Sequence, residues 1–164
     1  MANLRALGRR RFSAALAGAV VLPALAFAKD SALPVPSSLP LAAAAAAAKG
    51  EPLVLLVSLP GCPFCELVRR NYLLPARSDS GLQAWQLDIT NNSTPLLAFG
   101  GKTTTAALQI SAWKATFTPT VLFLGPQGQE LAERLVGIAV PDFYGAYLEE
   151  RLLTARKALL ASRQ

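Results

Sequence analysis

Residues 53–65 read LVLLVSLPGCPFC, and they include the only two cysteines of the 164-residue chain. Leu53–Val57 is a continuous apolar run, which is typical of a central β-strand that is buried on both faces. The turn Leu59-Pro60-Gly61 follows, and an amphipathic helical pattern begins at Cys62. The sequence therefore predicts a strand that delivers Cys62 and Cys65 to the first turn of a helix.

A Cys-x-x-Cys pair in this position has the features of a redox centre. The first turn of a helix offers unpaired N–H groups and a partial positive charge, and both favour a thiolate over a thiol. Such a position lowers the pKa of a cysteine from about 8.5 into a range of roughly 3.5–7.5. Cys65 follows one turn after Cys62, near enough to form a disulfide with it. So short a loop restricts the unfolded chain little, which argues against a purely stabilising disulfide.

The first 28 residues have the pattern of a secretory signal peptide. Its basic region holds four arginines: Arg5, Arg9, Arg10 and Arg11. Residues 12–28 carry no charge, and Ala26-Phe27-Ala28 fits a cleavage site before Lys29. We predict a cleaved signal peptide and a periplasmic protein, with retention as a membrane anchor as the alternative. Residues 9–12 also fit the twin-arginine export pattern. They fit the basic region of a signal peptide for the general secretory route equally well.

The net charge of +6 comes mostly from this leader. Removing its four arginines from the 16 Lys+Arg leaves 12 against 10 Asp+Glu, and no basic run remains. We therefore expect no nucleic-acid partner. An exported chain enters an oxidising compartment, in which disulfides persist.

The segment before the strand divides into two parts. Residues 29–40 are rich in Pro and Ser and predict a linker. The alanine-rich run Leu41–Ala48 predicts a short helix packed on the domain, with Ser38 as a possible cap. A partly ordered extension is the alternative for this run. The predicted organisation is a signal peptide at 1–28, a linker with a short helix at 29–49, and one domain at 50–164.

Strand and helix patterns alternate after the cysteines. We expect the cysteine helix to run to about Leu74 and to end at Pro75. Arg69 and Arg70 are expected on a face of this helix away from its apolar side chains. Residues 76–81 read as a loop. Strands follow at 85–89, 120–124 and 130–136, the last two joined by a turn at 125–128. A helix capped by Thr103 or Thr104 is expected before the strand at 120–124. The final helix begins near Pro141, with an apolar stripe of Phe143, Tyr147, Leu148, Leu152, Ala155 and Leu159. This order predicts an α/β fold, with a mixed sheet of about four strands and helices on both faces.

Four features together resemble one known family. They are the Pro-Gly-Cys-Pro-Phe-Cys turn after an apolar strand, Thr118-Pro119 before a strand, the Gly-Pro-Gln-Gly hairpin and the final amphipathic helix. Over residues 50–160 the chain is similar to the thioredoxin superfamily, in particular to exported bacterial thioredoxin-like proteins. The resemblance implies a thioredoxin-like fold and a redox-active Cys62–Cys65 disulfide, with no cofactor and no metal.

The resemblance also implies roles for individual residues. Cys62 is the nucleophile that attacks a substrate disulfide, and Cys65 resolves the mixed disulfide. Pro119 matches the family's cis-proline, and Thr118 and Pro119 are expected to hold an extended substrate by strand-like pairing. Pro63 and Phe64 complete the expected substrate-binding set: Pro63, Phe64, Thr118 and Pro119. Phe64 has two possible roles, an apolar contact to the substrate or a filling of the groove between helix and sheet.

Some positions depart from the family pattern. Leu56 stands where the family often has a buried carboxylate that accepts the proton of the second cysteine. Gly61 replaces an aromatic residue, and Arg70 replaces a helix-kinking proline. Cys65 therefore lacks an evident base. Glu66 is adjacent to it, but consecutive side chains on a helix do not face each other, so we interpret Glu66 as a first-turn carboxylate favoured by the helix dipole.

Other chemistries are excluded by composition. The chain has no histidine, which rules out a His-containing triad, a Cys–His pair and His metal ligation. Two cysteines cannot complete a tetrahedral zinc site within one chain.

The sequence thus predicts a monomeric, exported thiol–disulfide oxidoreductase that reduces protein disulfides and is itself re-reduced by a membrane electron donor. The Pro63-Phe64 dipeptide lacks the histidine that is typical of strongly oxidising family members, which favours reduction. Two alternatives remain. One is a non-catalytic binding or chaperone-like module that uses the Pro119 face, and the other is a thiol carrier for one pathway, such as cytochrome maturation or sulfur oxidation.

Overall fold

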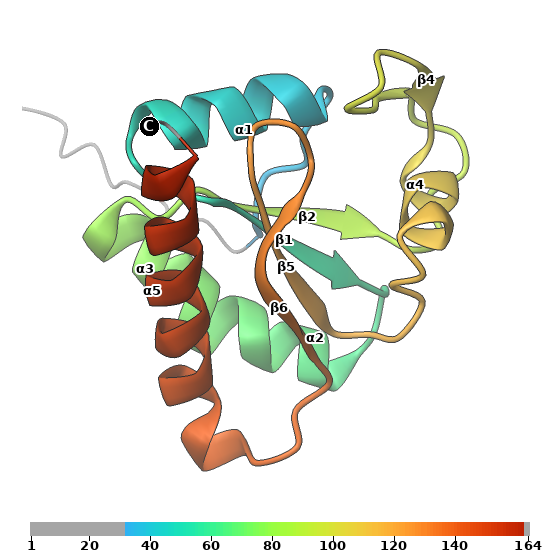
Figure 1. Ribbon diagram of the computed structural model, residues 1–164. Coiled ribbons are helices and arrows are strands. Elements are labelled where there is room, and N and C mark those ends of the chain that lie inside the picture. Colours follow the sequence, from blue (N-terminus) through green and yellow to red (C-terminus); the bar gives the residue numbers. More distant parts are fainter. Residues whose placement is uncertain (1–31, 163–164) are drawn as a thin grey trace, which may run out of the picture.

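The apolar run before the cysteines forms β1 (Leu53–Ser58), in the interior of a four-stranded sheet. The computed structural model, which describes residues 32–162, has the strand order β2-β1-β5-β6 (Figure 1). β2 (Ala84–Asp88) runs parallel to β1, β5 (Thr120–Leu124) pairs with β1 antiparallel, and β6 (Glu130–Val136) pairs antiparallel with β5. The predicted mixed sheet and α/β class are confirmed.

One face of β1 is covered by the cysteine helix and the last helix. Successive side chains of a strand point to opposite faces, so Val54 and Leu56 share one side. They belong to a core that also includes residues of α2 (Pro63–Val68) and α5 (Tyr144–Ala161). Leu56 is completely buried in this core, which explains why an apolar residue is stable where the family often has a carboxylate.

The other face of β1 is covered by two further helices. Leu53, Leu55 and Val57 belong to a second core, together with residues of α1 (Leu39–Ala48) and α4 (Ala106–Ala112). Figure 1 shows the resulting layers, with the sheet between the helices. Burial on both faces is the reason why β1 is apolar throughout instead of alternating.

The cysteine helix is longer than predicted, so the expected end at Pro75 is wrong. α2 continues into a π-helical turn, η1 (Arg69–Leu73), and then into α3 (Leu74–Ser80). Pro75 has no N–H, and a proline ring clashes with the carbonyl four residues earlier in an α-helix. The wider η1 turn, in which the Leu74 N–H bonds to the Arg69 carbonyl, lets the helix pass this point. The helix ends at Gly81, which takes a left-handed φ of 71°.

The described part of the predicted linker, residues 32–38, packs on the sheet. Leu33 lies in the same core as Val54, and the Pro34 carbonyl accepts a hydrogen bond of 2.9 Å from the Gln86 N–H of β2. Ser38 caps α1 by accepting a hydrogen bond of 3.3 Å from the Leu41 N–H. The expected linker is thus corrected here to an edge segment of the domain, and the packed alanine-rich helix is present as predicted. The predicted signal peptide lies outside the described residues.

Two smaller expectations also need correction. Thr103 and Thr104 form β4, which pairs with β3 (Leu96–Leu97), so the cap of α4 is Thr105. A 3-10 turn, η2 (Pro141–Phe143), precedes α5 and leaves Phe143 exposed. The buried stripe of α5 is Tyr144, Leu148, Leu152, Ala155 and Leu159, whereas Tyr147 is exposed.

No helix among residues 32–162 is long and apolar enough to cross a membrane.

The docking of α1 makes a prediction about two neighbouring alanines. Ala43 is buried in the second core, whereas Ala44 is exposed. Ala43→Glu should lower the free energy of unfolding by about 2 kcal/mol or more, because it forces a larger, charged side chain into packed space. Ala44→Glu should change it by no more than about 0.5 kcal/mol. Urea denaturation of both variants measures this, and equal effects would mean that α1 is not docked.

Candidate active site

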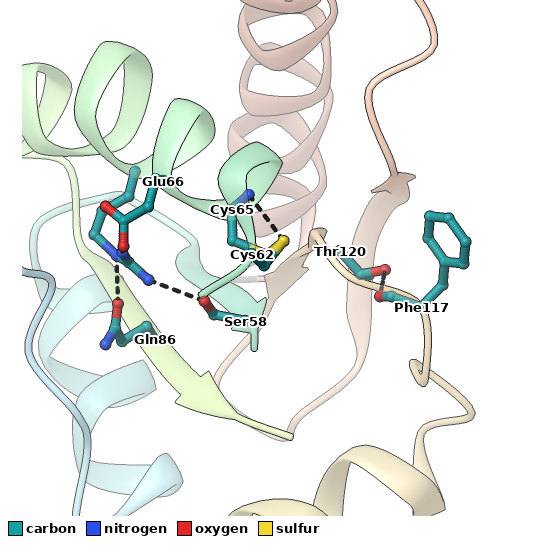
Figure 2. Close-up of a disulfide and its surroundings, with 8 residues drawn as sticks. Ser58, Cys62, Cys65, Glu66, Gln86, Phe117 and Thr120 are labelled. Atoms are coloured by element: carbon teal, nitrogen blue, oxygen red, sulfur yellow. Dashed lines mark hydrogen bonds and ion pairs between the residues drawn. A yellow bond between two sulfur atoms is a disulfide. The ribbon is translucent and has the colours of Figure 1, made fainter. Parts of the chain in front are cut away.

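The two cysteines are joined by a disulfide at the start of α2. Cys62 is the residue that caps the helix, Cys65 lies in its first turn, and their Cα atoms are 5.3 Å apart. The Cys62 Sγ accepts a hydrogen bond of 3.2 Å from the Cys65 N–H (Figure 2). A donor at this sulfur stabilises a negative charge there once the disulfide is reduced. The strand–turn–helix arrangement predicted for the cysteines is confirmed.

The turn that carries Cys62 depends on its glycine and its proline. Gly61 has a left-handed φ of 73°, a conformation that is strained for any residue with a Cβ. This explains the absence of the aromatic side chain common at this position in the family. The Cys62 N–H donates to the Leu59 carbonyl at 3.2 Å, which closes the turn. Pro63 occupies the first helical turn, where its missing N–H leaves no helix bond unmade.

The two sulfurs differ in their access to solvent. Cys65 is completely buried, on the same side of α2 as the buried Val68, whereas Cys62 is partly exposed. A thiolate must reach its target to react, so only Cys62 is open to an incoming disulfide. The geometry therefore fits an exposed nucleophile with a buried partner one turn away.

The segment before β5 is held in place by two hydrogen bonds. The Thr118–Pro119 peptide bond is cis, as the family resemblance implies. The Pro119 carbonyl accepts a hydrogen bond of 2.7 Å from the Gly137 N–H, and the Thr120 hydroxyl donates to the Phe117 carbonyl at 2.7 Å (Figure 2). Pro119 is buried and Thr118 is partly exposed.

A groove of about 320 Å³ brings together several of the predicted residues. Phe64, Thr118 and Pro119 line it, and Phe64 extends it to the cysteine turn. Phe64 is 56% exposed, so its side chain does not fill the space between helix and sheet. Pro63 is exposed but does not line the groove.

Sequence reasoning missed the rest of the groove lining, which is Phe117, Val136, Gly137, Ile138 and Ala139. Phe117 is 62% exposed in the structure, and the usable signal in the sequence was an aromatic residue two positions before the expected cis-proline. Residues 136–139 are the last residue of β6 and the three that follow it, and they reach the groove only through the hairpin, so no local pattern marks them.

A charged cluster joins the cysteine helix to the sheet, and it corrects the expected outward position of Arg69. Arg69 is buried, and its guanidinium donates to Gln86 Oε1 at 2.8 Å and to Ser58 Oγ at 2.9 Å (Figure 2). It also forms an ion pair with Glu66, whose other oxygen pairs with the exposed Arg70 at 3.1 Å.

Glu66 is therefore bound rather than free. The hydrogen bond from Arg69, joined by the charges of Arg69 and Arg70, outweighs partial desolvation and holds the pKa of the Glu66 carboxyl below its ordinary value. A carboxylate in this state is a poor proton acceptor for Cys65, in agreement with its interpretation as a first-turn carboxylate. Within residues 32–162, no three side chains of the metal-ligating types (His, Cys, Asp, Glu) come together.

The unequal burial of the cysteines predicts selective alkylation. In the reduced, folded protein, iodoacetamide should modify Cys62 at least about tenfold faster than Cys65, because Cys65 reacts only when the structure opens. Mass spectrometry of digested samples measures the two sites, and denatured, reduced protein serves as the control in which both react. Equal rates in the folded protein would contradict the assignment.

One family model and several solved structures are similar to this chain. The family model described as a thioredoxin-like domain matches residues 39–151. Among solved structures, the chain is similar to the periplasmic thioredoxin SoxS from Paracoccus pantotrophus (19% identity, TM-score 0.42, covering 62% of this chain and 96% of that one). It is also similar to thioredoxin O2 from Arabidopsis thaliana (17% identity, TM-score 0.49, covering 74% of this chain and 96% of that one). A third similar structure is thioredoxin NaTrxh from Nicotiana alata (14% identity, TM-score 0.49, covering 76% of this chain and 97% of that one). A search of curated proteins found no significant match. Because the family model spans more than half of the chain and the Cys62–Cys65 pair stands at the start of α2, this protein belongs to the thioredoxin-like domain family.

Proposed function

We propose that this protein is an exported thiol–disulfide oxidoreductase that reduces protein disulfides through Cys62 and Cys65. The observation that carries the proposal is the asymmetry of the pair. Cys62 is open to solvent and has an N–H donor at its sulfur, whereas Cys65 is buried within disulfide reach. A purely structural disulfide needs no such difference between its two sulfurs.

The proposed reaction is two successive thiol–disulfide exchanges. The Cys62 thiolate attacks one sulfur of the substrate disulfide, a mixed disulfide forms, and the second substrate sulfur leaves as a thiolate that takes a proton from water. Cys65 then loses its proton to solvent and attacks the Cys62 sulfur. The Cys62–Cys65 bond forms, the first substrate sulfur is released and protonated, and two electrons have passed to the substrate.

The groove beside the cysteine turn supports a polypeptide substrate. Its lining is mostly apolar, and the exposed rings of Phe64 and Phe117 offer contact area to side chains next to a substrate cysteine. Thr118 and Pro119 form its floor in our proposal, where an extended segment pairs with the backbone as an added strand.

Localisation, direction and partners complete the proposal. Export follows from the signal-like pattern of residues 1–28. Each round of reduction removes two electrons, so an exported reductase must be recharged, and a membrane electron donor would fill that role. We also propose that the protein acts as a monomer.

Reduction of insulin by dithiothreitol tests the catalytic proposal. The wild-type protein should accelerate it, and Cys62→Ser should lower the rate to that of dithiothreitol alone, because the attacking thiolate is gone. Once dithiothreitol is removed, Cys65→Ser should retain a mixed disulfide with the substrate, because the thiol that resolves it is gone. Equal rates for the wild type and Cys62→Ser would contradict the proposal and favour a binding module that needs no cysteine.

The groove makes a separate prediction about specificity. Phe117→Ala should lower kcat/KM for a protein disulfide about fivefold, the loss expected for a partly buried aromatic contact of about 1 kcal/mol. Reduction of the protein's own disulfide by dithiothreitol should stay unchanged, because the small thiol needs no groove. Leu108→Ala is the matched control, since Leu108 is 63% exposed on α4 and lies outside the groove lining. Equal kcat/KM values for the two variants would remove Phe117 from the substrate site.

A further inference from the structure

Arg69 is the one charged residue that is buried among residues 32–162, and the exchange reaction described above does not use it. Burial of a guanidinium is unfavourable unless its N–H groups are paired. Here each of its three nitrogens has a partner, and the partners come from three different elements. The cation is therefore firmly placed.

The guanidinium connects the two ends of the cysteine turn. Ser58 is the last residue of β1, four residues before Cys62, and Glu66 directly follows Cys65. Arg69 binds both of them, and Gln86 of β2 fixes its third nitrogen. Figure 2 shows Ser58 close to the cysteines, with its hydroxyl bound to this cluster. The position of the turn and the position of the cation are thus set by the same hydrogen bonds.

The helix geometry brings the positive charge towards the sulfurs. Cys65 and Arg69 are four residues apart, so their side chains lie on the same helix face. Helical side chains lean towards the N-terminus, which directs the Arg69 side chain back over the turn of Cys65. Its bonds to Glu66 and Ser58 agree with this direction.

The charges of the cluster do not cancel. Glu66 is shared between Arg69 and Arg70, and its side chain is 44% exposed against 9% for Arg69, so solvent screens the negative charge more than the buried positive one. Leu56 provides no buried negative charge on the sheet. Asp88, which pairs in register with Ser58, uses its Oδ1 to bind Thr90.

We propose that Arg69 is a positioning residue that stabilises the reduced, thiolate form of the Cys62–Cys65 centre and so raises its reduction potential. This inference rests on the proposed thiol–disulfide chemistry and deepens it. The disulfide is neutral, whereas the reduced centre carries a thiolate, and a fixed cation in a poorly solvated site lowers the free energy of the charged state alone.

Equilibration with glutathione measures this effect without a protein substrate. Two glutathione thiols give two electrons to the Cys62–Cys65 disulfide, that bond breaks, and glutathione disulfide forms. The two glutathione thiols release two protons. One protonates Cys65, and the other goes to solvent when Cys62 is a thiolate. Alkylation of quenched samples, followed by mass spectrometry, gives the reduced fraction and hence the equilibrium constant for reduction.

Arg69→Gln and Arg70→Gln form a matched pair of variants, because both side chains bind Glu66 and only Arg69 is buried. We expect Arg69→Gln to lower the equilibrium constant for reduction about tenfold, which corresponds to a potential about 30 mV more negative. Arg70→Gln should change the constant less than about twofold, because its charge is exposed and screened. Equal constants for the wild type and Arg69→Gln would overturn the proposal.

Two further variants separate charge from packing. Arg69→Lys keeps the cation, so it should stay within about threefold of the wild-type constant. Glu66→Gln removes the negative partner at a partly exposed position and should raise the constant, opposite in sign to Arg69→Gln. A constant that falls in Glu66→Gln would overturn the electrostatic account, even if Arg69→Gln does not fold. If the variants have unchanged potentials and the wild-type protein reduces insulin normally, this inference alone is rejected. If the potentials shift as expected but the wild-type protein does not reduce insulin, only the proposed function is rejected.

Discussion

Every residue of β1 is buried, because strands pair with it on both sides and helices cover both faces of the sheet. This burial makes the strand a fixed support. Its last residue, Ser58, is where the chain leaves the sheet and enters the turn that presents Cys62. The active centre is thus attached to the most constrained part of the molecule, and a rigid support keeps reacting groups in place.

The same burial divides the two cysteines into different environments. α2 lies against one core, so its inner face holds Cys65 and Val68 out of solvent, while the cap position leaves Cys62 accessible. One helix with two faces is enough to make one sulfur reachable and to protect the other. Chemical asymmetry in this disulfide is therefore a direct consequence of how the helix packs.

A polar cluster also results from this packing. The interior next to the cysteine turn contains Leu56 instead of a carboxylate, and the polar groups that do lie there are satisfied by Arg69. A guanidinium can serve several acceptors at once because its N–H groups point in fixed, separate directions. That property lets one side chain join the helix, β1 and β2.

Patterns within a few neighbouring residues were enough to predict the order of the main elements, the central place of β1 and the position of both cysteines at a helix start. The cis bond before Pro119 was expected from the family resemblance and not from a local pattern. Local patterns misplaced the helix end at Pro75, because the proline is accommodated by a π-helical turn. They also predicted a linker at residues 32–38, because the contacts of that segment are with the distant strands β2 and β3. The burial of Arg69 and the groove formed by Phe64, Phe117 and residues 136–139 are visible only in the folded chain. The reason is physical: a side chain's burial and partners depend on which distant strands and helices meet it, and helical periodicity alone does not specify them.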